Sequence, residues 1–204
     1  QEDKAYIPIT LTYGISEPCV SHIKEKFENN KGFTVSMEPI RHYPNGELAS
    51  HILGYIGKIS QQDEIEKYTK DKGYSSDSFI GKTGVEESQE VSLKGQDGFK
   101  KVMVDNRGNR TETISETQAV PGKNVYLSID SDLQKVAEES LKRTLESIRN
   151  GSEYKSKWGS YKPNESHKNA TSGAVVVLDV KTGKVLALAS YPSYDPNLFV
   201  TGIS

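Results

Sequence analysis

Two short segments carry the residue types of a serine nucleophile with a lysine base. Ser21 and Lys24 are spaced Ser-x-x-Lys, and Ser152 and Lys155 repeat that spacing. Such a pair works when both side chains lie in a dry cleft, where the amine loses its charge and accepts the hydroxyl proton. Ser21 falls on the polar side of a predicted helix and Ser152 in a polar loop, so we expect neither to be desolvated. A stand-alone serine acyltransferase using Ser21 or Ser152 is the alternative to a non-catalytic role.

Other chemically active residue types lack the spacing of a metal, nucleotide or hydrolase site. Lys-Thr-Gly occurs at 82–84 and 181–183, where it also suits a helix start and a hairpin turn. The four histidines form no His-x-x-x-His, and a single cysteine, Cys19, provides neither an intramolecular disulfide nor a cysteine metal site. Nucleotide-binding glycine loops and a Gly-x-Ser-x-Gly elbow are absent from the sequence. We expect no catalytic residue, no cofactor and no metal.

Two charged residues stand outside the regular patterns. Arg41 precedes a Tyr-Pro turn, and Glu86 falls in the first turn of a predicted helix. A polar network joining the loop at 41–57 to the helix at 84–94 would account for both residues. Two solvated charges account for the spacing equally well, so the sequence leaves both interpretations open.

Composition limits the classes of partner. The 204 residues carry 26 Lys and Arg against 28 Asp and Glu, a formal net charge of −2. Without a basic run, the electrostatic footprint of nucleic-acid binding is missing. The longest apolar run, at 174–178, is far shorter than the roughly 20 residues of a membrane-spanning helix. The sequence therefore predicts an α+β protein of one or two domains, with nucleic acid excluded as a partner.

The elements that must position these residues begin with short strands and a helix. Strands are expected at 4–12 and 33–37, with an amphipathic helix after Ser16 between them. Pro44 and Gly46 then mark a turn. The glycines that follow, at 54 and 57, favour close backbone approach over a regular helix.

Local signals predict the helix ends in the middle of the chain. A capping box at Ser60 and Asp63 opens a short helix that ends near 70. A second one at Thr83 and Glu86 opens a helix that Gly95 closes. A β-hairpin follows, with strands at 99–105 and 110–115.

The second half is dominated by one long helix. A strand at 124–129 leads into it, Asp130 or Ser131 caps it, and Gly151 ends it. Its apolar stripe comprises Leu133, Val136, Ala137, Leu141, Leu145 and Ile148. Residues 151–172 are polar and predict a surface loop or linker. The apolar hairpin at 174–190 has the pattern of a buried sheet, so we expect the last 35 or so residues to open a second domain.

Several motifs occur together in a fixed order. They are Arg41-x-Tyr43-Pro44-x-Gly46-x-x-Ala49-x-His51-x-x-Gly54-x-x-Gly57, Gly81-Lys-Thr-Gly84-Val-Glu86, Leu93-x-Gly95-x-x-Gly98, Leu127-Ser-Ile-Asp130-x-x-Leu133-Gln134, Ser190-x-Pro192 and Asp195-Pro196-Asn197. Together they resemble the non-catalytic N-terminal region of class B penicillin-binding proteins, the elongation type more than the division type.

The resemblance implies a pedestal, or dimerisation domain, that holds a D,D-transpeptidase domain away from the membrane. Residues 1–150 correspond to the pedestal, with 1–37 as part of its head subdomain; 151–172 form a linker, and 173–204 begin the transpeptidase domain. The family's catalytic motifs lie downstream of Asp195-Pro196-Asn197, so we expect this chain to lack enzymatic activity.

The resemblance also implies the setting of the parent protein. It would cross-link peptidoglycan stem peptides, bind β-lactams and be anchored to the outer face of the cytoplasmic membrane by a segment preceding this one. Expected partners are cell-wall morphogenesis proteins, with a homodimer as a further possibility. The interaction or structural residues implied by the motifs are Arg41, Tyr43, Pro44, His51, Gly54, Gly57, Gly84, Glu86, Asp195 and Asn197.

Overall fold

The structure is a computed structural model that describes residues 11–12, 14–27, 35, 40–70, 74, 78–105, 110–162 and 164–200. The chain divides into two compact units, the first made of 1–40 and 94–123 and the second of 41–93 and 124–204. Short antiparallel strand pairs and helices make the fold α+β, as the sequence predicts. The strands expected at 4–12 and 33–37 lie largely outside the described residues.

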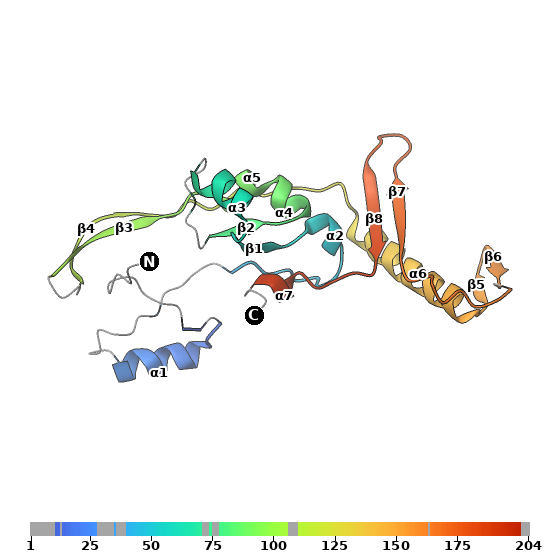
Figure 1. The fold of residues 1–204 in the computed structure, drawn as a ribbon, viewed down its shortest axis with the longest axis horizontal. Coiled ribbons are helices and arrows are strands. Elements are labelled where there is room, and N and C mark those ends of the chain that lie inside the picture. The colour runs from blue at the N-terminus through green and yellow to red at the C-terminus, as the bar shows by residue number, and fades with distance from the viewer. Residues whose placement is uncertain are drawn as a thin grey trace. The chain divides into compact units, whose positions relative to one another are not determined.

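The first unit contains a helix and a β-hairpin among its described residues (Figure 1). Helix α1 (Glu17–Phe27) begins directly after Ser16, whose carbonyl accepts the Val20 N–H at 2.9 Å. Strands β3 (Phe99–Val104) and β4 (Arg110–Thr117) pair antiparallel. The predicted helix and the two predicted strands are therefore confirmed, while the turn at 106–109 lies outside the described residues.

The second unit begins with a small sheet surrounded by short helices. Strand β1 (Ile56–Lys58) pairs antiparallel with β2 (Phe79–Gly81). The helices are α2 (Ser50–Leu53), α3 (Gln62–Glu64), the π-helical turn η1 (Ile65–Lys70), α4 (Gly84–Ser88) and α5 (Glu90–Lys94). Their shared core is apolar and aromatic and consists of Ile59, Tyr68, Tyr74 and Ile80, with Ile65 packed against them.

Both predicted capping boxes were wrong in detail. Gln61 rather than Ser60 is the N-cap of α3, and the Glu64 carboxylate accepts both backbone N–H groups, at 3.0 Å from Ser60 and 3.2 Å from Gln61. Thr83 is the N-cap of α4 but makes no side-chain cap hydrogen bond. The Glu86 carboxylate instead accepts from the side chains of Arg41 and Tyr43. The helix expected to run to Gly95 is also divided into α4 and α5.

Helix α6 (Ser131–Asn150) is the long helix that the sequence predicts. The Asp130 carboxylate caps it by accepting the N–H groups of Asp132 and Leu133 at 3.0 and 2.9 Å, and Gly151 ends it with a φ of 65°. The apolar stripe is wrong at Val136, which is 60% exposed. Gln134 is fully buried instead.

Strands β7 (Gly173–Leu178) and β8 (Val185–Tyr191) form the predicted apolar hairpin, and α6 packs against it, crossing it at the end away from the turn (Figure 1). The layer between them consists of Ala137, Ala187 and Ala189, flanked by Leu133, Leu141, Val175 and Val177. On the opposite face Val176 and Leu178 are more than half exposed. Among the described residues, therefore, this hairpin has one covered face.

Two further predictions for this half of the chain differ from the structure. Residues 124–129 do not form a strand; the segment bonds β8 only at its end, through Ser128 Oγ to Val185 O at 2.7 Å and Asp130 N–H to Leu186 O at 2.9 Å. The segment 151–172 is not a plain loop, because β5 (Tyr154–Ser156) and β6 (Gly159–Tyr161) form a small antiparallel hairpin there.

The chain beyond β8 returns to the first sheet of the same unit. Helix α7 (Asn197–Val200) packs near β1, and the Phe199 ring stacks on Tyr55 with centroids 4.2 Å apart. Among the helices that the structure describes, none combines the length and apolar character needed to cross a membrane.

Candidate functional site

Residues singled out by the sequence meet in the second unit around the carboxylate of Glu86. This side chain projects from the start of α4 and the residue is 5% exposed. One of its oxygens, Oε1, accepts hydrogen bonds from Arg41 Nε at 2.6 Å and from the Tyr43 hydroxyl at 3.0 Å. Of the two interpretations that the sequence left open for Arg41 and Glu86, the structure contains the polar network.

Burial and the carboxylate together set the protonation of this cluster. Burial and the negative charge of Glu86 raise the pKa of Tyr43 well above its ordinary value. Burial alone would lower the pKa of Arg41, but the hydrogen bond and charge of Glu86 raise it overall. Tyr43 is therefore a neutral hydrogen-bond donor and Arg41 a permanent cation, which suits a structural clamp rather than proton transfer.

Asn197 extends the cluster to the end of the described chain. Its side-chain oxygen accepts the Tyr43 backbone N–H at 2.9 Å, and its Nδ2 donates to the Tyr43 carbonyl at 2.9 Å. Asp195 Oδ1 in turn accepts the Asn197 backbone N–H at 2.9 Å and Nδ2 at 2.8 Å. We call Arg41, Tyr43, Glu86, Asp195 and Asn197 the polar junction.

The predicted turn after Tyr43 orients the junction. The Tyr43 carbonyl accepts the Gly46 N–H at 3.1 Å, closing a turn with Pro44 at its second position, where a fixed φ is favourable. The same carbonyl also accepts from Asn197. Pro44 itself is exposed and serves the turn rather than the contact.

Close backbone approach, predicted for Gly54 and Gly57, is found at Gly54 but not at Gly57, and it also occurs at Gly84. Gly54 has a φ of +77°, and a Cβ on it would lie 1.9 Å from the carbonyl oxygen of Thr83. Gly84 has a φ of +63°, and its Cβ would lie 2.5 Å from the Ile52 oxygen. Because neither position leaves room for a side chain, α2 and the start of α4 touch through bare backbone. At Gly57 a Cβ would meet only the flexible Lys82 side chain, at 3.1 Å.

His51 makes a second contact with the chain after β8. Its Nε2 donates to the Pro192 carbonyl at 2.9 Å as the Nε2–H tautomer, and its ring meets that of Tyr194 edge-on at 5.1 Å. The Tyr194 hydroxyl donates to the Ser50 carbonyl at 3.0 Å. No role was predicted for Tyr194, although its place between Pro192 and Pro196 indicates a constrained segment.

Two polar residues of α6 for which the sequence predicts no role also fix this region. Gln134 pairs with both backbone groups of Leu188 in β8, accepting the N–H at 2.7 Å and donating to the carbonyl at 3.0 Å. Glu138 accepts from Gln134 Nε2 at 2.7 Å and from the Ala49 N–H at 2.9 Å. Ala49 adopts a φ of 57°, an unfavourable value for a residue with a Cβ, so Glu138 holds a strained backbone position.

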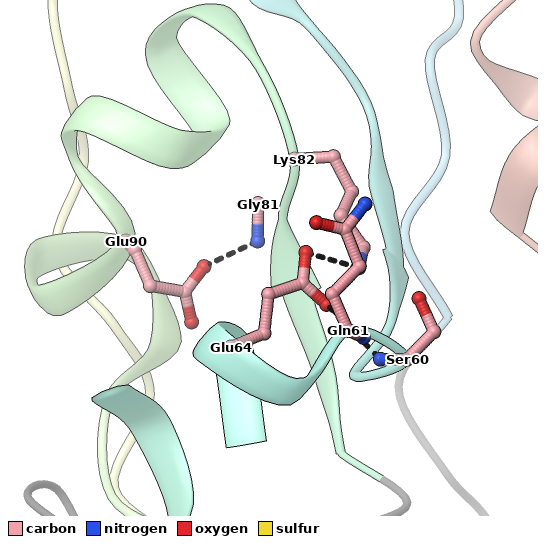
Figure 2. Close-up of polar contacts among 6 residues, drawn as sticks. All are labelled: Ser60, Gln61, Glu64, Gly81, Lys82 and Glu90. Atoms are coloured by element: carbon pink, nitrogen blue, oxygen red, sulfur yellow. Dashed lines mark hydrogen bonds and ion pairs between the residues drawn. The ribbon is translucent and has the colours of Figure 1, made fainter. Parts of the chain in front are cut away.

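Lys82, from the first Lys-Thr-Gly match, forms a partly buried ion pair (Figure 2). Its Nζ lies 2.7 and 2.6 Å from the two carboxylate oxygens of Glu64. Burial would raise the pKa of Glu64, but the hydrogen bonds from Lys82, Ser60 and Gln61 together lower it below its ordinary value. Figure 2 also shows Glu90, whose carboxylate accepts the backbone N–H of Gly81 at 2.7 Å.

The second Lys-Thr-Gly match is a hairpin turn, as predicted. The Asp179 N–H donates to the Lys184 carbonyl at 2.9 Å, and Gly183 has a φ of +71°. The hydrogen bond from the Thr182 hydroxyl lowers the pKa of the Asp179 carboxyl. Asp179 therefore braces the turn.

Neither Ser-x-x-Lys match forms a desolvated pair. Ser21 and Lys24 are both exposed on α1. Ser152 is also exposed, and Lys155 lies 3.2 Å from Glu153 with most of its side chain in solvent. Neither pair therefore lies in the dry cleft that a Ser-x-x-Lys nucleophile needs. Among the described residues, no group of three or more His, Cys, Asp or Glu side chains is arranged to hold a metal ion.

Comparison with known proteins identifies the family. Residues 1–127 match the penicillin-binding protein dimerisation domain. The chain belongs to the penicillin-binding proteins. Residues 173–203 match the penicillin-binding protein transpeptidase domain, so the junction residues Arg41, Tyr43 and Glu86 fall in the first match and Asp195 and Asn197 in the second.

Named relatives place this penicillin-binding protein in the elongation type, in agreement with the resemblance. It is 35% identical over 201 residues to the peptidoglycan D,D-transpeptidase MrdA of Haemophilus influenzae, covering 98% of this chain and 27% of that protein. It resembles the penicillin-binding protein PBP2 of a complex with MreC from Helicobacter pylori, with 26% identity, a TM-score of 0.62, and coverage of 100% and 33% of the two chains.

A third similarity is to a chain in a structure described as the coordination of polymerization and crosslinking by a peptidoglycan synthase complex. That chain is 30% identical, with a TM-score of 0.66, and the match covers 95% of this penicillin-binding protein and 31% of its neighbour. The chain thus spans about a third or less of the proteins that it matches.

Proposed function

We propose that this chain is the non-catalytic pedestal of a class B penicillin-binding protein, followed by the first strands of its transpeptidase domain. The proposed boundaries are 1–150 for the pedestal, 151–172 for the connecting segment and 173–204 for the start of the transpeptidase domain. The polar junction supports this proposal best. Asn197 bonds both backbone groups of Tyr43, so a segment of the transpeptidase match is fastened to the dimerisation match by directional contacts.

Such a junction suits a module that transmits orientation. A packed element held by directional hydrogen bonds has few alternative arrangements, so a force or partner acting on the pedestal would change the orientation of the attached domain. The exposed Ser21 and Ser152 support a non-enzymatic role for this chain, because neither has a desolvated lysine beside it. The serine acyltransferase alternative is not favoured.

We further propose that the full-length protein is an anchored D,D-transpeptidase at the outer face of the cytoplasmic membrane. Its serine would be acylated by peptidoglycan stem peptides and trapped by β-lactams. A morphogenesis protein of the MreC kind is the partner that we propose for the pedestal, since a similar protein is found in complex with MreC.

The test uses Arg41→Ala and Glu86→Ala in the full-length protein, with the exposed neighbour Glu87→Ala as the control. We expect both junction variants to lower cross-linking of stem peptides and binding to MreC from the same organism, while Glu87→Ala behaves as wild type. Unchanged stability, binding and cross-linking in both junction variants would show that these roles are wrong.

Self-association through the pedestal stays a prediction from the family's name for the domain. Sedimentation equilibrium over a range of concentrations tests it. A mass that rises to twice the monomer value supports a homodimer, and a constant monomer mass excludes it.

A further inference from the structure

The hairpin after α6 exposes the single tryptophan of the chain. Strands β5 and β6 are joined by a tight turn, and Trp158 in that turn is 86% exposed. The turn is braced, since Ser156 Oγ donates to the Gly159 carbonyl at 2.9 Å and accepts the Trp158 N–H at 3.2 Å. A large ring held in solvent contributes nothing to the core, which makes it a candidate contact residue.

A pair of tyrosines stands on the strands behind this turn. Tyr154 lies directly opposite Tyr161 in the antiparallel register, so both side chains are on the same face of the hairpin. Arg143 of α6 anchors the pair, with its guanidinium 5.4 Å from the Tyr154 ring centroid and Nη2 3.4 Å from the Tyr154 hydroxyl. Tyr161 remains well exposed. The hairpin is thus fixed to the helix at one ring and presents two others.

Lysines alternate with these rings along the hairpin. Lys155, Lys157 and Lys162 are all exposed, and Lys157 Nζ lies 4.8 Å from the centre of the Trp158 ring. Glu153 pairs with Lys155 at 3.2 Å, and Lys157 and Lys162 add two further basic side chains to the hairpin. We call Tyr154, Trp158, Tyr161, Lys157 and Lys162 the aromatic hairpin.

The side-chain types of residues 151–172 indicate which class of partner the hairpin suits. Residues 151–172 contain no Leu, Ile, Val, Met or Phe, so the large side chains of the hairpin are aromatic rings with polar edges and lysines, with no aliphatic side chains among them. Flat rings with polar edges match sugar rings, whose faces carry C–H groups and whose edges carry hydroxyls. The ammonium groups match carboxylates, with which they form charge-assisted hydrogen bonds.

We propose that the aromatic hairpin is a binding site for a carboxylate-bearing glycan strand. This inference rests on the proposed function, because peptidoglycan combines a sugar backbone with the free carboxylates of its stem peptides. Trp158 and Tyr161 would stack on sugar rings, and Lys157 and Lys162 would bond the carboxylates. The site would hold a strand near the protein without taking part in the cross-linking chemistry.

The test is co-sedimentation of the 204-residue chain with purified peptidoglycan sacculi, together with the emission of Trp158, which reports on this site alone. Soluble glycan strands that keep their stem peptides should shift or quench the Trp158 emission. We expect Trp158→Ala to weaken sacculus binding about tenfold, the equivalent of about 1.4 kcal/mol. Lys157→Gln should weaken it less and reduce its sensitivity to salt. The matched control is Tyr126→Ala, which removes another highly exposed ring from the same unit.

Equal sacculus binding by Trp158→Ala and wild type would overturn the proposal. A shift of Trp158 emission with phosphatidylglycerol vesicles, but not with glycan strands, would overturn it in favour of a membrane surface. Fluorescent penicillin labelling of the full-length protein separates this inference from the proposed function. If the wild type is not labelled, the proposed function fails; if wild type and Trp158→Ala are both labelled but bind sacculi equally, only the glycan site fails.

Discussion

Glu86 binds two members of the polar junction, Arg41 and Tyr43, through a single carboxylate oxygen. Arg41 and Tyr43 both donate to Oε1, and the residue is almost completely buried. A buried carboxylate is tolerated only where donors replace the water that it has lost. The partners of Glu86 therefore decide whether it stabilises or destabilises the fold.

Replacement of Glu86 by Ala is expected to lower the free energy of unfolding by about 2–4 kcal/mol, because the Arg41 guanidinium and the Tyr43 hydroxyl lose their acceptor together. Urea unfolding of the isolated chain measures the change. The exposed Glu87→Ala is the control and should stay within about 0.5 kcal/mol of wild type. Equal effects of the two replacements would contradict the importance assigned to the junction.

The ion pair of Glu64 with Lys82 predicts a pH dependence with a definite sign. The folded protein holds the pKa of Glu64 below its ordinary value, so the pair stabilises the fold above the unfolded pKa and loses this effect as the pH falls through the folded pKa. At neutral pH, Glu64→Gln should cost about 1–2 kcal/mol. That cost should begin to shrink near the ordinary glutamate pKa of about 4.3.

Urea unfolding of wild type and Glu64→Gln between neutral pH and acid measures this dependence. The exposed Glu139→Gln on α6 provides the control, for which we expect little change at any pH. A cost of Glu64→Gln that grows as the pH falls would have the wrong sign for a carboxylate stabilised by its partners.

At the scale of elements, side-chain amides replace missing strand partners. Gln134 of α6 bonds the N–H and carbonyl of Leu188 in β8, and Asn197 at the start of α7 bonds the same two groups of Tyr43. Each amide offers one donor and one acceptor, which is what an unpaired backbone position requires. The contacts between helices and neighbouring segments are thereby fixed in register.

Gln134→Ala is expected to destabilise the chain by about 2–4 kcal/mol, because it leaves both Leu188 backbone groups unpaired and opens a small cavity. Lys135→Ala changes the exposed neighbour on the same helix and should be nearly neutral. Hydrogen exchange at the Leu188 amide gives a local reading, and we expect faster exchange only in the Gln134 variant. Unaltered exchange would show that the amide contact does not protect β8.

The contact between α2 and α4 depends on the absence of a side chain at Gly54. A Cβ there would collide with the Thr83 carbonyl as well as strain a positive φ, so Gly54→Ala should cost more than about 3 kcal/mol. Gly183 has a similar φ, but a Cβ on it would meet nothing within 4 Å. Gly183→Ala therefore measures the cost of a positive φ without a collision, and we expect it to lower the free energy of unfolding by about 1–2 kcal/mol. Thermal unfolding of both variants compares the two costs. Equal losses would mean that backbone contact at Gly54 is unimportant.

Capping residues, apolar periodicity and turn residues predicted the elements that interactions between neighbouring residues stabilise. Helix α6 follows from its caps at Asp130 and Gly151 and from its apolar stripe, and the turn at Pro44 follows from the fixed φ of proline. The burial of Gln134 was not predictable in this way, because its partner lies in β8, far along the chain. The hairpin at 154–161 was hidden by the polar composition of its segment, although a glycine beside Trp158 between two tyrosines was a turn signal.

The residues of the candidate site divide in the same way, into those that the sequence could indicate and those whose roles depend on tertiary contacts. The motif residues could be chosen by resemblance, and the Arg41 and Glu86 pair could be stated as one of two interpretations. The bonds from Asn197 to Tyr43 could not be derived, because spacing along a chain gives no distance between segments separated by 154 positions. Tyr194 and Glu138 acquire their roles only through such tertiary contacts.

At the scale of the whole molecule, the polar junction joins segments that match two different domains of the penicillin-binding proteins. Under the proposed function, reactivity belongs to the rest of the full-length protein and this chain supplies rigid connections. The serines of its Ser-x-x-Lys matches are exposed to solvent, without the dry cleft that such a nucleophile needs.

Labelling with a fluorescent penicillin tests that division of roles most directly. The 204-residue chain and the full-length protein are incubated with the reagent side by side and compared on a denaturing gel. We predict strong covalent labelling of the full-length protein and none of the 204-residue chain. Labelling of the shorter chain that disappears in Ser21→Ala or Ser152→Ala would contradict the proposal.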